Sequence, residues 1–249
     1  MRPGSLAILG IAAYSTFLVA TVPARWVAER FVPNPGRLAL TEVEGTVWSG
    51  RAKAALGTLS GVLAVEQLEW RFLPSRLLQA RAAYDVSMRG AGFEARGELA
   101  RTFAGWSARS VAATADAALA TAAVPWLGAW RPEGKVNLAT DALDFDAREA
   151  RGTARLDWTN AATSLSQVKP LGTYRAEVIA EGPAAQVKVS TLAGALRVSG
   201  QGRLDFPARF SFTGEARAEA AQAAALEPLL NLMGAPRPDG SHAIDWRTR

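Results

Sequence analysis

Residues 152–174, GTARLDWTNAATSLSQVKPLGTY, repeat features of an earlier part of the chain. The segment GTARLDW at 152–158 resembles GTVWSGRA at 45–52, and KPLGT at 169–173 resembles LPSRL at 73–77. A third pair follows, PWLGAWRPEG at 125–134 and PLLNLMGAPRPDG at 228–240. The three pairs occur in the same order, which points to an internal duplication.

The offsets between the paired segments are similar. They are 107 residues from Gly45 to Gly152, 96 from Pro74 to Pro170, and 106 from Gly134 to Gly240. A nearly constant offset predicts two similar tandem units, at about 36–140 and 141–249. Chance agreement, or turn residues that any series of strands shares, is the alternative explanation.

Composition and charge restrict the class of protein. A chain of 249 residues of which 49% are apolar can bury a sizeable core and is not disordered. Cysteine is absent, which excludes disulfides and thiolate metal sites but does not fix the compartment. The net charge of +5 comes from arginines spread singly, whereas a nucleic-acid-binding protein is expected to cluster them. We therefore expect no nucleic-acid partner.

Residues 6–22, LAILGIAAYSTFLVATV, carry no charge. As a helix this run would be about 26 Å long, close to the ~30 Å hydrocarbon core of a bilayer. Three interpretations stay open, namely an uncleaved single-span anchor, a signal peptide cleaved near Pro23, and a buried core helix. The length of the run favours the anchor, with Trp26 as an interfacial residue. Arg2 and the terminal amine precede the run and Arg25, Arg30 and Arg37 follow it, a count that does not favour an outside C-terminus.

From residue 36 onward, apolar and polar residues alternate. Tyr174, Ala176 and Val178 alternate with Arg175 and Glu177, and similar runs occupy 48–56, 187–191, 196–200 and 203–212. This period of two predicts strands with one apolar and one wet face, which is typical of antiparallel sheets. Turn residues every 8–12 positions or so predict a meander of hairpins. The fold class is therefore mainly β, with a long sheet that must curl or be covered at its edges.

Two segments interrupt the strand period. Residues 219–233, EAAQAAALEPLLNLM, are rich in helix formers, and Gly234 follows as a stop. Pro228 predicts a kinked or two-part helix. Residues 117–127 look like the shorter counterpart in the first unit, so each unit is expected to contain several strands and one short helical segment. Residues 240–246 are expected to start a further strand.

The chain has eight tryptophans. Packing in the core of a curved sheet is their ordinary role, and a surface for a protein partner is the alternative. The candidate partner-contact or packing residues are Trp48, Trp70, Trp126, Trp130 and Trp158.

Groups able to catalyse a reaction are few. His242 stands beside Ser241 and three residues before Asp245, but neighbouring residues of a strand point to opposite faces, which argues against a triad. We expect His242 to be exposed near the chain end. Gly90, Gly92 and the glycines after them do not fit a dinucleotide fingerprint, and no Walker-type loop occurs. We expect no catalytic residue, no cofactor and no enzymatic activity.

Carboxylates gather between residues 141 and 149. Asp144 and Asp146 would share one face of a strand, but the spacing of a calcium loop is absent. Nearby basic residues indicate a solvated charged face rather than a metal site. The residues of this group are Asp141, Asp144, Asp146, Arg148, Glu149 and Arg151.

Several segments, taken together, resemble the type II secretion system protein N family. They are the apolar N-terminal run, VEGTVWSG at 43–50, Trp70 with Leu73-Pro74, WRPEG at 130–134, residues 152–158, PLGTY at 170–174, and LNLMG at 230–234 with Asp239-Gly240. No single segment is specific, but they cover nearly the whole chain in the expected order.

The resemblance implies an inner-membrane protein whose C-terminal body lies in the periplasm. Its parts would be a short cytoplasmic start (1–4), a transmembrane signal anchor (5–27) and a periplasmic β domain (28–249). The expected function is that of an accessory scaffold of type II protein secretion, with inner-membrane platform proteins and the outer-membrane secretin as partners. The family is also similar to AsmA-like proteins, whose curved sheets line apolar grooves. A lipid-handling groove protein is therefore the alternative function.

Overall fold

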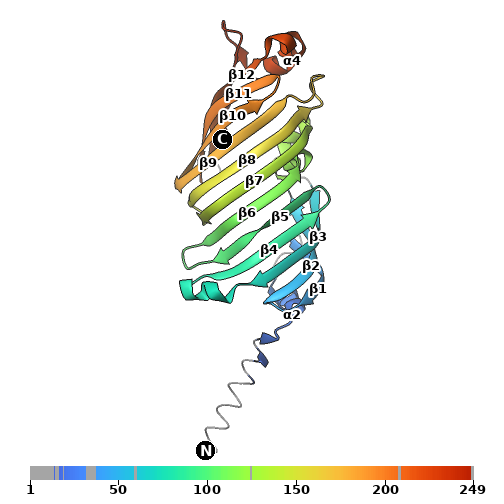
Figure 1. Ribbon diagram of the computed structural model, residues 1–249, viewed down its shortest axis with the longest axis vertical. Coiled ribbons are helices and arrows are strands. Elements are labelled where there is room, and N and C mark those ends of the chain that lie inside the picture. The colour runs from blue at the N-terminus through green and yellow to red at the C-terminus, as the bar shows by residue number, and fades with distance from the viewer. Residues whose placement is uncertain are drawn as a thin grey trace, which may run out of the picture.

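The computed structural model describes residues 14, 17–18, 20–31, 38–58, 61–123, 125–206 and 209–247. These residues form one antiparallel sheet of 14 strands together with short helices (Figure 1). The strands lie in sequence order up to β12, after which β14 pairs with β12 and β13 is the outermost strand. The prediction of a mainly β fold with a long antiparallel sheet is confirmed.

The strands and helices have the following bounds. The first seven strands are β1 (Leu38–Gly45), β2 (Ser49–Thr58), β3 (Gly61–Phe72), β4 (Ala82–Gly90), β5 (Phe93–Arg101), β6 (Trp106–Asp116) and β7 (Pro132–Phe145). The others are β8 (Ala150–Thr163), β9 (Gly172–Gly182), β10 (Ala184–Ala193), β11 (Leu196–Asp205), β12 (Arg209–Ala218), β13 (Ala235–Pro236) and β14 (His242–Arg247). The helical elements are α2 (Ala24–Phe31), η1 (Pro74–Gln79), η2 (Ala117–Leu119), α3 (Ala120–Ala123), η3 (Pro125–Ala129), η4 (Ala220–Gln222) and α4 (Ala223–Met233).

The two faces of the sheet differ in composition, as the alternating sequence predicts. Ala176 in β9 lies opposite Leu156 in β8, and the next pair along, Arg175 and Asp157, points to the other face. The same register continues through the neighbouring strands, so that apolar side chains line up on one face and charged ones on the other. We call these the inner face and the outer face.

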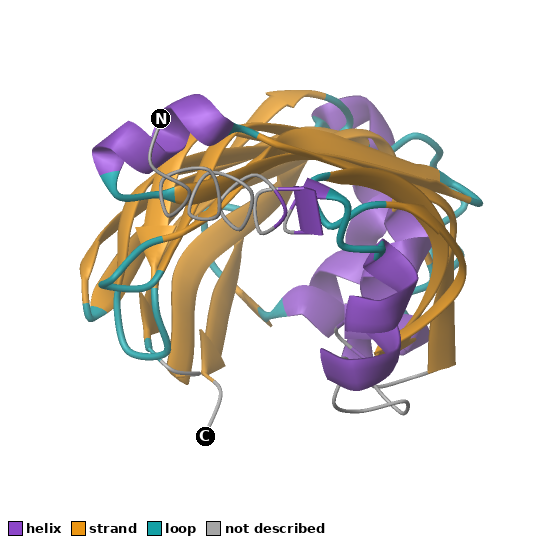
Figure 2. Cartoon of the chain, turned by 90° about the horizontal axis from the view of Figure 1, so that it is seen from below, coloured by secondary structure: helices purple, strands orange, loops and turns teal. Residues whose placement is uncertain are grey.

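The sheet curves around its inner face. Figure 2 shows the sheet as an arch with α-helices beneath it. Helix α4 packs on the inner face, where Leu226, Leu229 and Leu230 are buried together with Phe212 of β12 and Ile244 of β14. The apolar face is therefore the concave one, which answers the requirement that a long sheet must curl or be covered.

Each strand is antiparallel to its neighbour, so successive connections alternate between the two borders of the sheet that are formed by the strand ends. We call these two borders the edges of the sheet. The helical connections after β6 and after β12 leave from the same edge, which we call the helix edge (α4 lies on the right in Figure 1). The β1–β2 turn, η1 and the β5–β6 turn lie at the opposite edge, which we call the turn edge. Both α-helical connections thus lie at one edge, which also carries the β4–β5 turn.

The predicted helical segments are confirmed, with finer divisions. Residues 219–233 contain η4 and then α4, which encloses Pro228 and ends before Gly234. The segment 117–127 divides into η2, α3 and η3, of which α3 has only four residues. The predicted strand near 240–246 is β14. The alternating run 203–212 was wrongly treated as one strand, because it spans the turn between β11 and β12.

The paired segments that indicate a duplication lie in the following places. Gly134 and Gly240 both follow a helical connection at the helix edge. Pro74 and Pro170 follow β3 and β8, which run in opposite directions, so they lie at opposite edges. Gly45 ends β1, whereas Gly152 lies within β8. The division into two tandem units and the likeness to AsmA-like proteins stay predictions.

Most of the predicted transmembrane anchor, 5–27, lies outside the described residues. Among the residues that the structure does describe, no helix is both long and apolar enough to cross a membrane. The end of the segment is described. Pro23 forms an isolated bridge with Thr46, and the amide of Val47 donates a hydrogen bond to the carbonyl of Val22 over 3.1 Å. The N-terminal segment is therefore tied to the β1–β2 turn.

Candidate functional site

The inner face differs between the first region of the sheet, β1–β7, and the second region, β8–β14. In the second region α4 and the loop before β9 cover it, and Leu171, Leu196 and Phe212 are buried beneath them. Tyr174 is buried as well, and its hydroxyl donates to the carbonyl oxygen of Leu196 over 2.9 Å. Burial raises the pKa of Tyr174 strongly. This part of the face is a closed apolar core.

In the first region the inner face is only partly covered. Leu99 on β5, Trp106 on β6 and Leu138 on β7 expose 38%, 43% and 37% of their surface. The buried apolar residues of this region are mostly alanines, with Val65 the one larger side chain among the described residues. Apolar side chains that line up across several strands and stay accessible form a surface that an apolar ligand or partner could contact.

The two helical connections differ in composition. Helix α4 has 11 residues and buries three leucines. The connection after β6 divides into η2, α3 and η3, and its α3, with the four residues ATAA, lies near β3. Alanine and threonine side chains cover far less area than leucine, so α3 closes less of the inner face than α4 does.

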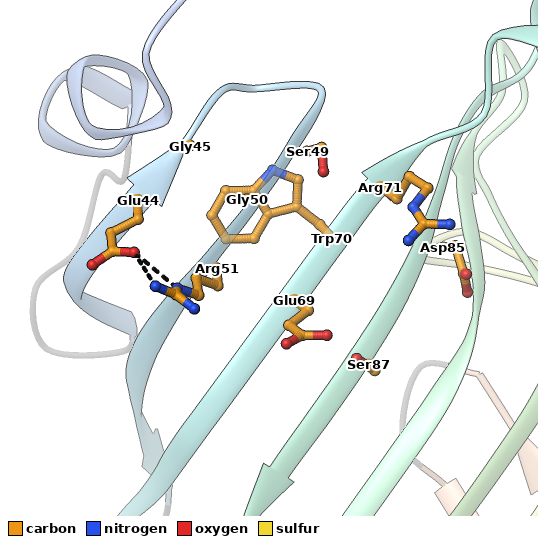
Figure 3. A pocket seen from close by; sticks show the side chains of 10 residues that line it. All are labelled: Glu44, Gly45, Ser49, Gly50, Arg51, Glu69, Trp70, Arg71, Asp85 and Ser87. Carbon is orange, nitrogen blue, oxygen red and sulfur yellow. Dashed lines mark hydrogen bonds and ion pairs between the residues drawn. The ribbon is translucent and has the colours of Figure 1, made fainter.

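The candidate tryptophans belong to two separate groups. In the first, the ring of Trp48 meets Phe72 edge-on at 4.9 Å, and the indole nitrogen of Trp70 donates to the carbonyl of Thr46 over 3.1 Å. The indole of Trp70 lies over Gly50, where a Cβ atom would come within 2.5 Å of the ring (Figure 3). No sequence signal predicted this contact.

In the second group, Trp158 donates to the carbonyl of Glu133 over 2.9 Å and lies 5.9 Å from the ring of Tyr174. Trp130 packs against the core under α4. The side chain of Trp126 lies outside the described residues. Packing roles are thus evident for four of the five, and a partner-contact role stays a prediction.

The outer face carries rows of paired charges. Arg51 of β2 bonds Glu44 of β1 at 2.7 Å, and this pair borders a shallow hollow of about 370 Å³ in the first region (Figure 3). Glu69, Arg71 and Asp85 also line that hollow. The charges alternate in sign, which favours a hydrated polar surface over a site for one ion.

Two cross-strand pairs lower the pKa of a carboxyl group. Arg175 donates two hydrogen bonds to Asp157, at 2.7 and 2.8 Å, and these bonds hold the pKa of Asp157 below its usual value. The hydrogen bonds from Arg109 lower the pKa of Asp144 in the same way. Both carboxylates therefore stay ionised at neutral pH and link neighbouring strands on the outer face.

The expected charged cluster near residues 141–149 is confirmed as solvated, with one difference. Asp144 lies in β7, but Asp146 lies in the following turn, where it accepts hydrogen bonds from the amides of Arg148 and Glu149. The two aspartates therefore do not share one strand face. No group of three or more potential metal ligands occurs among the described residues.

The prediction that His242 is exposed is wrong. His242 begins β14 on the inner face, opposite Ala216, and it is 8% exposed because α4 lies beside it. Its Nε2 atom lies 3.1 Å from Oδ1 of Asn231 in α4. The residues around His242 in the sequence did not predict this contact, because Asn231 lies eleven residues earlier in the chain.

The predicted absence of a triad agrees with the geometry. Ser241 is buried, but its hydroxyl donates to Asp239 over 2.7 Å rather than to His242. Asp245 bonds Arg247 instead. These described side chains therefore form structural contacts of the last turn and strand, not a nucleophile activated by a base.

The most exposed large apolar side chains among the described residues lie at the turn edge. Phe103 in the β5–β6 turn is 96% exposed, and Leu78 in η1 is 93% exposed. Phe103 and Trp106 line a hollow of about 450 Å³ together with the residues that follow η1. Sequence reasoning missed this patch, although Leu77-Leu78 and Phe103 stand among polar and small residues where no strand period explains them.

The comparisons with known proteins settle the family. The family model for type II secretion system protein N matches residues 36–245, which include all the strands of the sheet except the last two residues of β14. The chain belongs to the type II secretion system protein N family. Neither the curated proteins nor the solved structures give a match. As a member of the protein N family, the chain is assigned to the type II secretion machinery, and the resemblance seen in its sequence is confirmed.

Proposed function

We propose that the chain is a membrane-anchored scaffold of type II secretion, held in the inner membrane by residues 5–27 with its sheet in the periplasm. The family match over residues 36–245 carries this proposal. The apolar N-terminal run supports the anchor, since its length is close to that of a bilayer core. The described residues also provide no metal cluster and no activated nucleophile, which favours a role in binding over one in catalysis.

The outer face is the surface that we assign to the platform proteins and the secretin. It is long, polar and rich in charged side chains, such as Arg96 on β5 and Lys188 on β10, both exposed. Charged rows favour specific, salt-sensitive contacts with complementary proteins. The inner face suits such contacts less, because α4 covers its second region and the accessible side chains of its first region, such as Leu99, Trp106 and Leu138, are apolar.

Site-specific crosslinking in native membranes tests this assignment. A photo-reactive amino acid at position 96 or 188 should yield adducts with platform proteins or the secretin, whereas the same group at position 138 on the inner face is the matched control. Adducts with these proteins from position 138 alone, or from none of the three, would contradict the scaffold assignment.

A second candidate, a lipid-handling groove, rests on the accessible apolar surface around Leu99, Trp106 and Leu138. Acyl chains would bind such a concave apolar surface through burial of their methylene groups. Mass spectrometry of the purified full chain, together with the crosslinker at position 138, separates the two functions. Co-purifying lipid and lipid adducts at position 138 favour the groove, and their absence argues against it.

Topology is the premise of both candidates. The chain has no cysteine, so a single cysteine introduced at position 188 can be labelled with a membrane-impermeant maleimide. We expect labelling in spheroplasts without permeabilisation. Labelling only after the inner membrane is opened would place the sheet in the cytoplasm and remove the proposed contact with the secretin.

A further inference from the structure

The apolar N-terminal run ends next to the turn edge. Val22, its last residue, accepts a hydrogen bond from the amide of Val47 in the β1–β2 turn. From there the contacts lead to η1, since the amide of Phe72 donates to the carbonyl of Trp48 over 2.6 Å and η1 begins two residues later. Neighbouring strands are about 4.8 Å apart, so η1 starts roughly 10 Å from the end of the run.

Two connections at this edge expose apolar side chains side by side. Leu77 and Leu78 of η1 are 54% and 93% exposed, and Phe103 of the β5–β6 turn is 96% exposed. Pairing of Ala82 with Arg101 brings the end of η1 beside that turn. Val62 and Leu232 are also exposed, but each is the one exposed large apolar residue of its own strand or helix among the described residues. Single ones are common on protein surfaces, whereas a cluster marks a contact site.

The two connections that form this cluster carry only positive charges, although Asp146 and Glu149 of the neighbouring β7–β8 turn also line the hollow beside Phe103. The segments 73–81 and 101–106 contain Arg76, Arg81 and Arg101 and no carboxylate. Arg76 reaches Glu98 on the outer face at 2.8 Å, and Arg101 lies over the ring of Trp106 at 5.3 Å. Apolar tips between arginines match the interface of a bilayer that contains anionic lipids, where acyl chains and phosphates lie next to each other.

Helix α2 carries the same combination. Trp26 is 59% exposed, and Arg25 and Arg30 lie on the same short helix, with Glu29 the one acidic residue. Tryptophan is enriched at the depth of the lipid headgroups. The helix follows the apolar run directly, so it begins at the depth where the run would leave the bilayer.

We propose that η1 and the β5–β6 turn insert Leu78 and Phe103 into the headgroup region of the membrane that holds the N-terminal run, as a second contact with anionic lipid. The inference rests on the proposed anchor. The second contact would fix the tilt of the sheet, because a body held at one point alone can rotate about that point. It would also hold β3 at a steep angle to the membrane plane, so that Val62, at the opposite end of β3 from η1, lies in water.

Fluorescence quenching on the full chain tests this proposal, since the absence of cysteine lets single labels be placed at will. Leu78→Cys and Phe103→Cys would carry an environment-sensitive fluorophore in vesicles of phosphatidylethanolamine and phosphatidylglycerol. Val62→Cys is the matched control, because Val62 is also strongly exposed and belongs to the strand that leads to η1. A strand of this length spans roughly 36 Å.

We expect nitroxide groups near the headgroups to quench positions 78 and 103 at least twofold more than position 62, and less when phosphatidylcholine replaces phosphatidylglycerol. Equal quenching at positions 78 and 62 would overturn the proposal, and the patch would then be left for a protein partner. Equal quenching in vesicles with phosphatidylglycerol and in vesicles with phosphatidylcholine would overturn the anionic preference. Flotation of the same vesicles tests the anchor separately, because it measures whether the chain stays bound to the membrane. A chain that does not float with the vesicles contradicts the proposed function itself.

Discussion

In the second region of the sheet α4 buries Leu226, Leu229 and Leu230 against β12 and β14, whereas the matching connection in the first region is divided into η2, α3 and η3, of which α3 has only four residues. The strands themselves alternate in the same way in both regions. The comparison teaches that the strand pattern determines which face is apolar, but the connecting helix determines whether that face is closed. A closed face contributes stability, and an accessible one is free to bind.

The largest expected difference concerns buried leucines. Leu226→Ala should lower the free energy of unfolding by about 2–5 kcal/mol, because Leu226 is fully buried and its removal leaves a cavity. Val65→Ala, the matched change in the first region, removes less buried surface and should cost about 1.5 kcal/mol. Urea unfolding of the full chain in detergent measures both. Equal costs would show that the first region is closed as tightly as the second.

Glycines beneath aromatic rings sharpen the comparison. In the second region, a Cβ at Gly200 would lie 2.6 Å from the ring of Phe212, which is buried in the core and cannot move away. A Cβ at Gly50 would lie 2.4 Å from the backbone carbonyl oxygen of Glu44 and 2.5 Å from the ring of Trp70, which is held by its hydrogen bond to Thr46. We expect Gly200→Ala and Gly50→Ala each to cost about 1–3 kcal/mol. A much smaller cost at Gly50 in thermal unfolding would show that the first region adapts more easily than the second.

Accessible apolar residues of the inner face should matter little for stability. Leu138→Ser should change the free energy of unfolding by less than about 1 kcal/mol, because the side chain is 37% exposed and leaves no closed cavity. The same change in the core, Leu230→Ser, should be several times more harmful. Binding of an apolar dye to the folded chain should fall for Leu138→Ser. An unchanged dye signal would mean that this face is not accessible.

The outer faces of the two regions should behave alike, with the smallest effects. Asp144 and Asp157 have lowered pKa values in the folded chain, because arginines bond them. Each carboxylate therefore stabilises the fold above its unfolded pKa of about 3.9, and this contribution is lost as the pH falls through the folded value. Asp144→Asn and Asp157→Asn should each lower the Tm by a degree or two at pH 7.

The difference from the unsubstituted chain should shrink as the pH falls below the unfolded pKa and through the lowered folded pKa of each carboxyl group. Scanning calorimetry at pH 7 and at pH 3 checks this, with Asp205→Asn as a control for general loss of charge, since Asp205 bonds Arg203 within the same strand. A Tm difference that grows on acidification would contradict the assigned direction of the pKa shifts.

The sequence predicted the sheet and its two faces because alternation is local information, as in Tyr174 to Val178. Gly234 likewise marked the end of α4, whereas Pro228 lies inside one helix that continues on both sides of it. Contacts between distant segments were not predictable in this way. Burial of His242 depends on Asn231 of α4, and the contact of Trp70 with Gly50 depends on the register of β2 and β3. The exposed patch at Leu78 and Phe103 required knowing that two connections leave from the same edge.

Pairing between neighbours in the sequence has a consequence for how the protein is made. Each strand from β2 to β11 pairs with the strands directly before and after it in the sequence, so none of these strands requires a distant partner. Such a chain can fold progressively while it is still emerging from the ribosome or a translocation channel, because each new hairpin adds to a sheet already present. The segment α4 to β14 emerges after these strands, and its arrival completes the larger apolar core.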